Sequence, residues 1–393
     1  MTRTLTALLA LGLFAGCAPK VRAAFTEARD AALAPPAPLS ADWRPDLAIT
    51  LSDELLARGL GAGLGSGRLK ESFNLGAIAA SAELFLETLE VGAAASGCEG
   101  CIGARLALTG DLGTEGLVSL KMLANVRADL DIALSLVEDD DGFALLAKPV
   151  SVRSLQIILD GMGNRGARIP QDALQHAMTP VVLKAIPPIT LARLGRIDLP
   201  VRAARLRPVE DGVELHLATG APGSTDSVTP APPPFTGLTA VIHTDTALAL
   251  ARAGAFAKGP VERNLWIEPT GLILVKDTFS LGLRVWKDSP LARWWREYEV
   301  DGDWTGGKGR VRLRPGGVTA RARSASAGGV DPLRLANQAK LLARLEDALA
   351  AGLPTSRTHD VGGTRLSWQV TDMADEDGLL RLKGDVVFEQ GLR

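Results

Sequence analysis

The stretch VSLKMLANVRADLDIALSL, residues 118–136, decides the fold of this chain. Its even-numbered positions are all apolar, whereas most of its odd-numbered positions are polar or charged. An alternation with a period of two predicts a β-strand with one buried face and one wet face. At ~3.3 Å per residue such a strand would extend ~60 Å. It must therefore twist strongly, and its apolar face must lie against something long.

The segments around this strand predict a sheet and a helix. Alternating runs precede it at 106–112 and follow the turn at Glu138–Gly142. QDALQHAMTPVVLKAI, residues 171–186, has apolar side chains at helical spacing, which predicts an amphipathic helix kinked near Pro180. Strands are predicted near 197–206 and 213–217. The first half is therefore predicted as a long antiparallel sheet wrapped on a helix.

A change of composition separates this half from a second one. ATGAPGSTDSVTPAPPP, residues 218–234, is too poor in apolar residues to pack and predicts a semi-extended linker. The order of elements then repeats: Ser52 and Thr244 are each predicted to cap a helix, and residues 331–353 predict a second long helix. EDGVELHL at 210–217 also matches EDGLLRLK at 376–383. The predicted fold class is α+β, with two pseudo-repeat domains, each a long twisted antiparallel sheet wrapped around a long amphipathic helix.

The lengths of the predicted elements suggest a groove. A helix of some 16 residues spans only ~24 Å, so apolar sheet surface would stay uncovered unless the other domain or an apolar ligand lies on it. A packed core without a cavity is the alternative. The groove candidates are Leu120, Met122, Val126, Ala128, Leu130 and Ile132 on the long strand, Met178 and Val182 on the helix, and Phe279, Leu281 and Leu342 in the second half.

Two halves of this kind, joined by a proline-rich linker, resemble the tubular lipid-binding superfamily, which includes bactericidal/permeability-increasing protein. The resemblance covers nearly the whole chain after Cys17 and rests on the order of elements, because the family has no invariant motif to match. It implies a lipid-binding protein that holds acyl chains in an apolar groove between sheet and helix. The cysteines depart from the family pattern, because Cys98 and Cys101 can close only a local loop.

The N-terminal residues predict a secretory signal. LTALLALGLFAG, residues 5–16, is apolar and too short to span a bilayer. Ala15 and Gly16 before Cys17 resemble the lipobox of bacterial lipoproteins, whose cysteine is diacylated and begins the mature chain; a signal peptide with a chance cysteine is the alternative. Ala18, where Asp would favour the inner membrane, points by resemblance to the outer membrane. The predicted location is the periplasmic face of the outer membrane, with a diacylglyceryl anchor carrying palmitate-type chains at Cys17.

The predicted organisation follows from these features. It comprises a lipoprotein signal peptide at 1–16, an N-terminal tether at 17–45, a first lipid-binding-type domain at 46–217, a linker at 218–236 and a second such domain at 237–393.

Cys98 and Cys101 are predicted to form a disulfide at a hairpin tip, because the periplasm is oxidising. Half a zinc site and a redox pair are the alternatives. Zinc would need two more ligands, and the four histidines are dispersed, so no metal is expected.

Charge gives one more candidate site. The chain has 43 basic and 45 acidic residues, a net charge of −2, so nothing draws it to nucleic acid. Arg310, Arg312 and Arg314 alternate on one predicted strand and could hold the phosphate of a lipid head group; a solvated strand face is the alternative.

Enzyme motifs are incomplete, so no catalytic activity and no cofactor are predicted. GLGAGLGSG at 59–67 lacks the spacing of a nucleotide-binding loop, and GDWTGGKG at 302–309 lacks the Ser or Thr that would hold magnesium. The predicted function is a periplasmic lipid-binding and possibly lipid-transfer lipoprotein. The alternative is a scaffold lipoprotein of an envelope complex without lipid cargo; its protein partners are not predicted.

Overall fold

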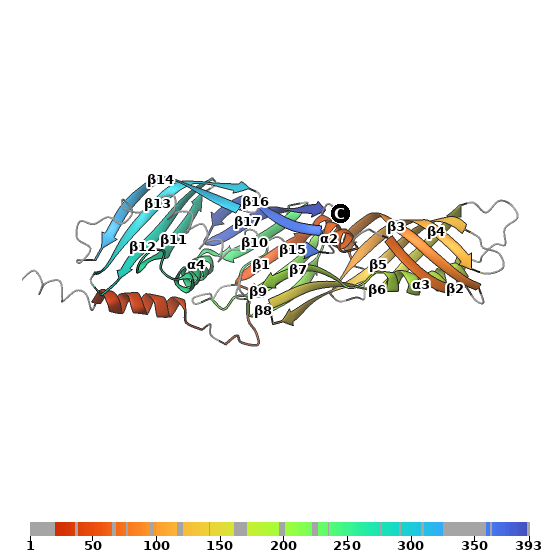
Figure 1. Ribbon diagram of the computed structural model, residues 1–393, viewed down its shortest axis with the longest axis horizontal. Coiled ribbons are helices and arrows are strands. Elements are labelled where there is room, and N and C mark those ends of the chain that lie inside the picture. Colours follow the sequence, from red (N-terminus) through yellow and green to blue (C-terminus); the bar gives the residue numbers. More distant parts are fainter. Residues whose placement is uncertain are drawn as a thin grey trace, which may run out of the picture.

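Three antiparallel sheets make up the molecule, one at each end and one between them (Figure 1). The computed structural model describes residues 20–35, 38–64, 68–75, 78–94, 98, 100–115, 121–140, 142–160, 171–195, 201–221, 227–234, 236–275, 277–290, 292–307, 310–324, 359–361 and 364–390. The molecule is elongated, with β2–β7 at one end and β11–β14 at the other (Figure 1). The described strands pair antiparallel in all three sheets, and a few helices lie between them along the chain, which fits the predicted α+β class.

The sheet of the first half has six strands in sequence order. They are β2 (Arg68–Leu75), β3 (Ile78–Ala93), β4 (Cys101–Glu115), β5 (Lys121–Asp139), β6 (Gly142–Asp160) and β7 (Ile189–Gly195). β5 is the long strand that the alternation predicts, and it has 19 residues. Helix α3 (Gln171–Ala185) contacts both β2 and β6, and three strands lie between these two in the sheet. The sheet therefore curls around the helix as a half-barrel.

The middle sheet joins the two halves. Its order is β15-β16-β17-β10-β1-β9-β8, so strands of the first half pair with strands of the second. The bounds are β1 (Leu47–Ser52), β8 (Ala203–Val209), β9 (Gly212–Ala218), β10 (Gly237–His243), β15 (His359–Val361), β16 (Thr364–Glu376) and β17 (Leu379–Gln390). β1 and β10 run antiparallel, with Ile49 opposite Ala240. This pairing makes the two halves one continuous structure.

The sheet of the second half has four strands, β11 (Leu265–Val275), β12 (Thr278–Asp288), β13 (Arg293–Gly307) and β14 (Arg310–Arg323). One of its faces carries Ile267, Leu283, Val285 and Val300, all buried. The helix predicted at 331–353 lies outside the described residues, as do Leu342 and Leu120.

In each half a helix starts directly after the first strand, as predicted: α2 (Asp53–Gly63) follows β1 and α4 (Thr244–Lys258) follows β10. Only α2 has the predicted cap. Ser52 caps α2, because its hydroxyl accepts a hydrogen bond from the Leu55 N–H at 3.1 Å. The prediction for Thr244 is wrong, because α4 includes that residue in its first turn. His243 occupies the cap position, and its side chain makes no capping hydrogen bond.

The predicted linker is bound to the middle sheet where the structure describes it. Val228 is buried and packs on Ala48 and Val241, and its N–H donates to the carbonyl of Pro45 at 3.0 Å. The Thr239 hydroxyl donates to the carbonyl of Pro232 at 2.9 Å. The expectation that this segment is too poor in apolar residues to pack is therefore wrong, because Val228 and Ala231 pack on the middle sheet.

The predicted tether contains a helix that sequence reasoning missed. Residues 20–32 are helical, and Val21 and Phe25 are buried against the second half. The signal was present, because Val21, Ala24, Phe25, Ala28 and Ala32 follow helical spacing. Cys17 lies outside the described residues. In the described part of the chain, none of the helices is long and apolar enough to cross a membrane.

Candidate functional site

The inward face of β5 carries most of the groove candidates. Met122, Val126, Ala128, Leu130 and Ile132 share this face and are all buried, with Leu130 fully buried. Ala128 lies opposite Leu106 of β4 and Leu155 of β6, which are also buried. The alternation in the sequence therefore identifies the buried face of this strand correctly.

α3 brings two more candidates to the same face. Met178 is 0% and Val182 1% exposed, and both belong to the hydrophobic cluster that contains the β5 residues. α3 contains Pro180, which cannot donate a helical hydrogen bond. A polar contact also ties α3 to the sheet: Lys184 Nζ lies 3.0 Å from Glu71 Oε2, near the surface.

The expectation that α3 leaves apolar sheet surface uncovered is wrong for the described residues. β5 is buried along its inward face from Met122 to Leu134. α2 also packs on this sheet, against β3 and β7, with Leu55, Leu56 and Leu60 in the same cluster. β8 of the middle sheet adds contacts to β5. Two helices, α2 and α3, and strand β8 of the middle sheet together bury this face, whereas the prediction included α3 alone.

Phe279 and Leu281 lie elsewhere, on the buried face of β12. They face Gly302 and Val300 of β13 and are 3% and 0% exposed. The cluster of buried apolar side chains that contains the β5 candidates continues through the middle sheet to these residues. The candidates thus form one apolar interior, divided between two sheets.

The predicted head-group arginines belong to β14, the edge strand of the second sheet. On β14 Leu313 lies opposite Trp304, which is buried, whereas Arg312 and Arg314 lie opposite Thr305 and Asp303. Arg314 is exposed, and the side chains of Arg310 and Arg312 lie outside the described residues. Strand alternation places these positions away from Phe279 and Leu281. A head group at Arg314 would therefore be separated by the sheet from chains packed on its inner face.

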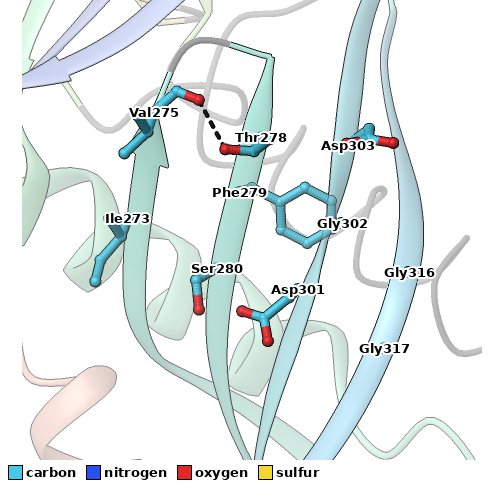
Figure 2. A pocket seen from close by; sticks show the side chains of 10 residues that line it. All are labelled: Ile273, Val275, Thr278, Phe279, Ser280, Asp301, Gly302, Asp303, Gly316 and Gly317. Carbon is cyan, nitrogen blue, oxygen red and sulfur yellow. Dashed lines mark hydrogen bonds between the residues drawn. The ribbon is translucent and has the colours of Figure 1, made fainter.

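A surface depression of about 370 Å³ lies near the tip of the β11–β12 hairpin (Figure 2). Its lining includes Ile273 and Val275, which are more than half exposed, and Asp301 and Asp303. Figure 2 shows the Thr278 hydroxyl donating to the carbonyl of Val275, at 2.7 Å, which closes the hairpin. The two carboxylates make this site unfavourable for a phosphate group.

The outward face of the first sheet carries a polar network. Ser154 donates to Asp129 Oδ2 at 2.6 Å, and Arg105 Nε donates to Asp129 Oδ1 at 3.1 Å. These bonds, the serine first and then the arginine, hold the pKa of Asp129 below its usual range. This network lies on the face of β5 that the polar odd-numbered positions of residues 118–136 predict to be solvated.

The corresponding outward face of the second sheet is covered at one end by aromatic side chains. Phe25 of helix 20–32 lies 5.5 Å from Trp266 and 5.7 Å from Trp286, between ring centroids, and Phe256 of α4 lies 6.0 Å from Phe25. Trp295 packs at the edge of this group. Trp286 is buried and Trp295 is half-buried.

Glu268 lies beneath these rings with no exposed surface. Its Oε2 accepts a hydrogen bond from Trp286 Nε1 at 2.8 Å, and Arg252 of α4 pairs with its Oε1. Arg284 lies 3.8 Å from Oε2. The buried charge is thus paired and hydrogen-bonded, as burial requires.

Cys98 and Cys101 form a disulfide in the β3–β4 connection, as predicted. Within the described ranges, no group of three or more His, Cys, Asp or Glu side chains could hold a metal ion.

No protein-family model matches this chain, and no curated protein matches it in sequence. Several solved structures have a similar arrangement. A crystal structure of lipopolysaccharide binding protein has a TM-score of 0.38 and 12% identity, covering 88% of this chain and 99% of that one. P47 from Clostridium botulinum A2 has a TM-score of 0.35 and 9% identity, covering 87% and 97%. At TM-scores this low, these likenesses carry no inference about this chain.

Proposed function

We propose that this protein binds acyl chains between the curled sheet β2–β7 and helix α3, as a non-enzymatic lipoprotein anchored through Cys17 at the periplasmic face of the outer membrane. One observation carries the proposal: α3 closes an inward sheet face that is apolar without interruption from Met122 to Leu134. Transfer of the bound lipid to another membrane would be a further step of the same function.

The contact between α3 and the sheet is of a kind that an acyl chain could replace. α3 contributes Leu174, Met178, Val181 and Val182 to the apolar cluster. An acyl chain could replace these side chains at about equal apolar burial and leave no buried polar group unpaired. Lys184 is 75% exposed in its pair with Glu71, and exposed ion pairs are worth only about 0–1 kcal/mol. Little beyond apolar contact therefore holds α3 in place.

We also propose that the two halves are structural repeats. β1 is followed directly by α2, and β10 directly by α4, and the two strands lie side by side and antiparallel in the middle sheet. A second long helix at 331–353 would then cover the inner face of β11–β14 as α3 covers that of β2–β7. The second half would thus offer an equivalent lipid site beside Phe279 and Leu281.

Lipid binding is tested on the purified full chain by extraction with organic solvent and mass spectrometry of the extract, followed by titration with a fluorescent fatty acid. Ala128→Trp should abolish fatty-acid binding because the indole fills the space between sheet and helix. Ala133→Trp, on the opposite face of the same strand, is the matched control and should bind normally. Circular dichroism checks that each variant is folded. An extract without lipid, together with a wild-type chain that binds no fatty acid, would refute the proposal.

The second candidate function is a scaffold in an envelope complex. It is favoured by the complete burial of Leu130 and Met178 by the chain itself, which leaves no open groove along β5 in this conformation. In that case Ala128→Trp is simply an overpacked core and should cost about 1–3 kcal/mol of stability in a protein that never contained lipid.

A further inference from the structure

The helix at residues 20–32 is held firmly on the end of the second half. Val21 and Phe25 are 6% and 3% exposed, and both lie in the aromatic cluster with Phe256 and Trp286. In Figure 1 this helix (red) runs along the second half, and its first residues lie at the extremity of the molecule away from the first half.

The chain between this helix and β1 is bound as well. Arg205 of β8 donates to the carbonyl of Ala41 at 3.3 Å, and its guanidinium lies 4.4 Å from the centroid of the Trp43 ring. Pro45 accepts the backbone hydrogen bond of Val228. The end of the segment predicted as a tether, at residues 41–45, is therefore held against the middle sheet.

The chain between Cys17 and the first residue of the helix is short. Three peptide steps separate Cys17 from Lys20, and consecutive Cα atoms are 3.8 Å apart, so the two Cα atoms can be at most about 11 Å apart. A lipid on Cys17 would consequently hold the helix, and the end of the second half with it, next to the bilayer.

That end of the molecule is basic. Lys20 and Arg22 are exposed on the first turn of the helix, on either side of Val21. Close by, Lys287 Nζ donates to the carbonyl of Arg263, and the Asp288 N–H donates to the carbonyl of Asn264. Among the described residues, this end includes the cations Lys20, Arg22, Arg263, Lys287 and Arg293 and the anions Glu262 and Asp288, the latter paired with Arg293. Basic excess at a membrane-proximal surface attracts anionic lipid.

We infer that this basic end of the second half is a membrane-docking surface: the helix at 20–32 holds it against the anionic lipids around the Cys17 anchor. The first half then projects away from that membrane, with α3 and its sheet at the far end. This inference rests on the lipid anchor of the proposed function but not on lipid cargo.

Energy transfer from single labelled positions to a head-group-labelled lipid tests this orientation. The acylated full chain is reconstituted in vesicles of phosphatidylethanolamine and phosphatidylglycerol. One label is placed at Ala292→Cys, exposed beside the basic end, and the other at Asn74→Cys, exposed on β2. Transfer should be several-fold stronger from position 292. Equal transfer from both positions in acylated protein would overturn the inference.

A pair of variants isolates the role of the helix. Phe25→Asp buries an unpaired charge and should release the helix, so that transfer from the two positions becomes nearly equal. Ala23→Asp adds the same charge to the exposed face of the helix and should preserve the difference. If Phe25→Asp also preserves it, the helix does not set the orientation.

Charge and anchor are tested separately. Lys20→Glu with Arg263→Glu should weaken transfer from position 292 on vesicles that contain phosphatidylglycerol but not on vesicles of phosphatidylcholine alone; equal loss on both would refute attraction to anionic lipid. Absence of palmitate labelling that depends on Cys17 would remove the anchor and this inference together. The extraction and fatty-acid titration described above report lipid cargo independently of either result.

Discussion

The outward faces of the two end sheets differ, although both belong to alternating strands. In the first half this face carries Asp129, Arg105 and Ser154 in a solvated network. In the second half the same kind of face carries Trp266, Trp286 and Glu268, buried or half-buried beneath helix 20–32 and α4. Asp129 on one alternating strand is about one-third exposed, with a side-chain exposure of 33%, whereas Glu268 on another has no exposed surface.

This difference shows that alternation separates two faces of a strand but does not say what covers each of them. One end of the outward face of the second sheet is covered because the helix at 20–32, far away in the sequence, packs its apolar stripe there. The first sheet has no such partner on its outward face within the described residues, and Leu123 and Ile158 remain about half exposed there.

The largest effect is expected from Glu268→Ala. Removing one member of a buried ion pair costs about 3–5 kcal/mol, and here the Trp286 N–H also loses its acceptor. Denaturant unfolding measures the change. Glu268→Gln retains an acceptor for Trp286 and should cost less. A loss below about 1 kcal/mol for Glu268→Ala is typical of exposed pairs. It would show that the outward face of the second sheet is solvated like that of the first.

A matched pair on β5 tests the two faces of one strand. Leu130→Ala should cost about 2–5 kcal/mol because it leaves a cavity in a packed interior. Leu123 is 49% exposed on the outward face, and Leu123→Ala should change the free energy of unfolding by no more than about 0.5 kcal/mol. Thermal unfolding of both variants measures the two losses of stability. Similar losses would contradict the assignment of faces.

Asp129→Asn should have a smaller effect than Glu268→Ala or Leu130→Ala, at about 0.2–1 kcal/mol near neutral pH. Because hydrogen bonds lower the pKa of Asp129 in the folded state, its contribution is present above the unfolded-state pKa and is lost as the pH falls through the folded-state pKa. The stabilities of wild type and variant should therefore converge in acid. A difference that grows as the pH falls would mean that the carboxyl is not ionised in this network.

Local features of the sequence predicted the elements that depend on near neighbours. The period of β5, the helix at α3 and the Ser52 cap each depend on residues a few positions apart. The Thr244 cap was predicted with the same rule and is wrong, because His243 comes first and has an extended backbone that serves as the cap position. Residues 20–32 have a helical stripe as clear as that of α3, although the prediction for this segment is a tether.

Sequence alone determined which face of each long strand is apolar, because side chains alternate at a fixed period whatever lies beyond the strand. It also determined that residues 171–186 would turn an apolar stripe inward. Only the tertiary structure decided what meets those faces: α2 beside α3, the shared sheet formed by β1 and β10, and the helix at 20–32 on the tryptophans. Apolar attraction has no direction and scales with buried area, so a stripe specifies burial but not its partner; chain connectivity and shape select the partner.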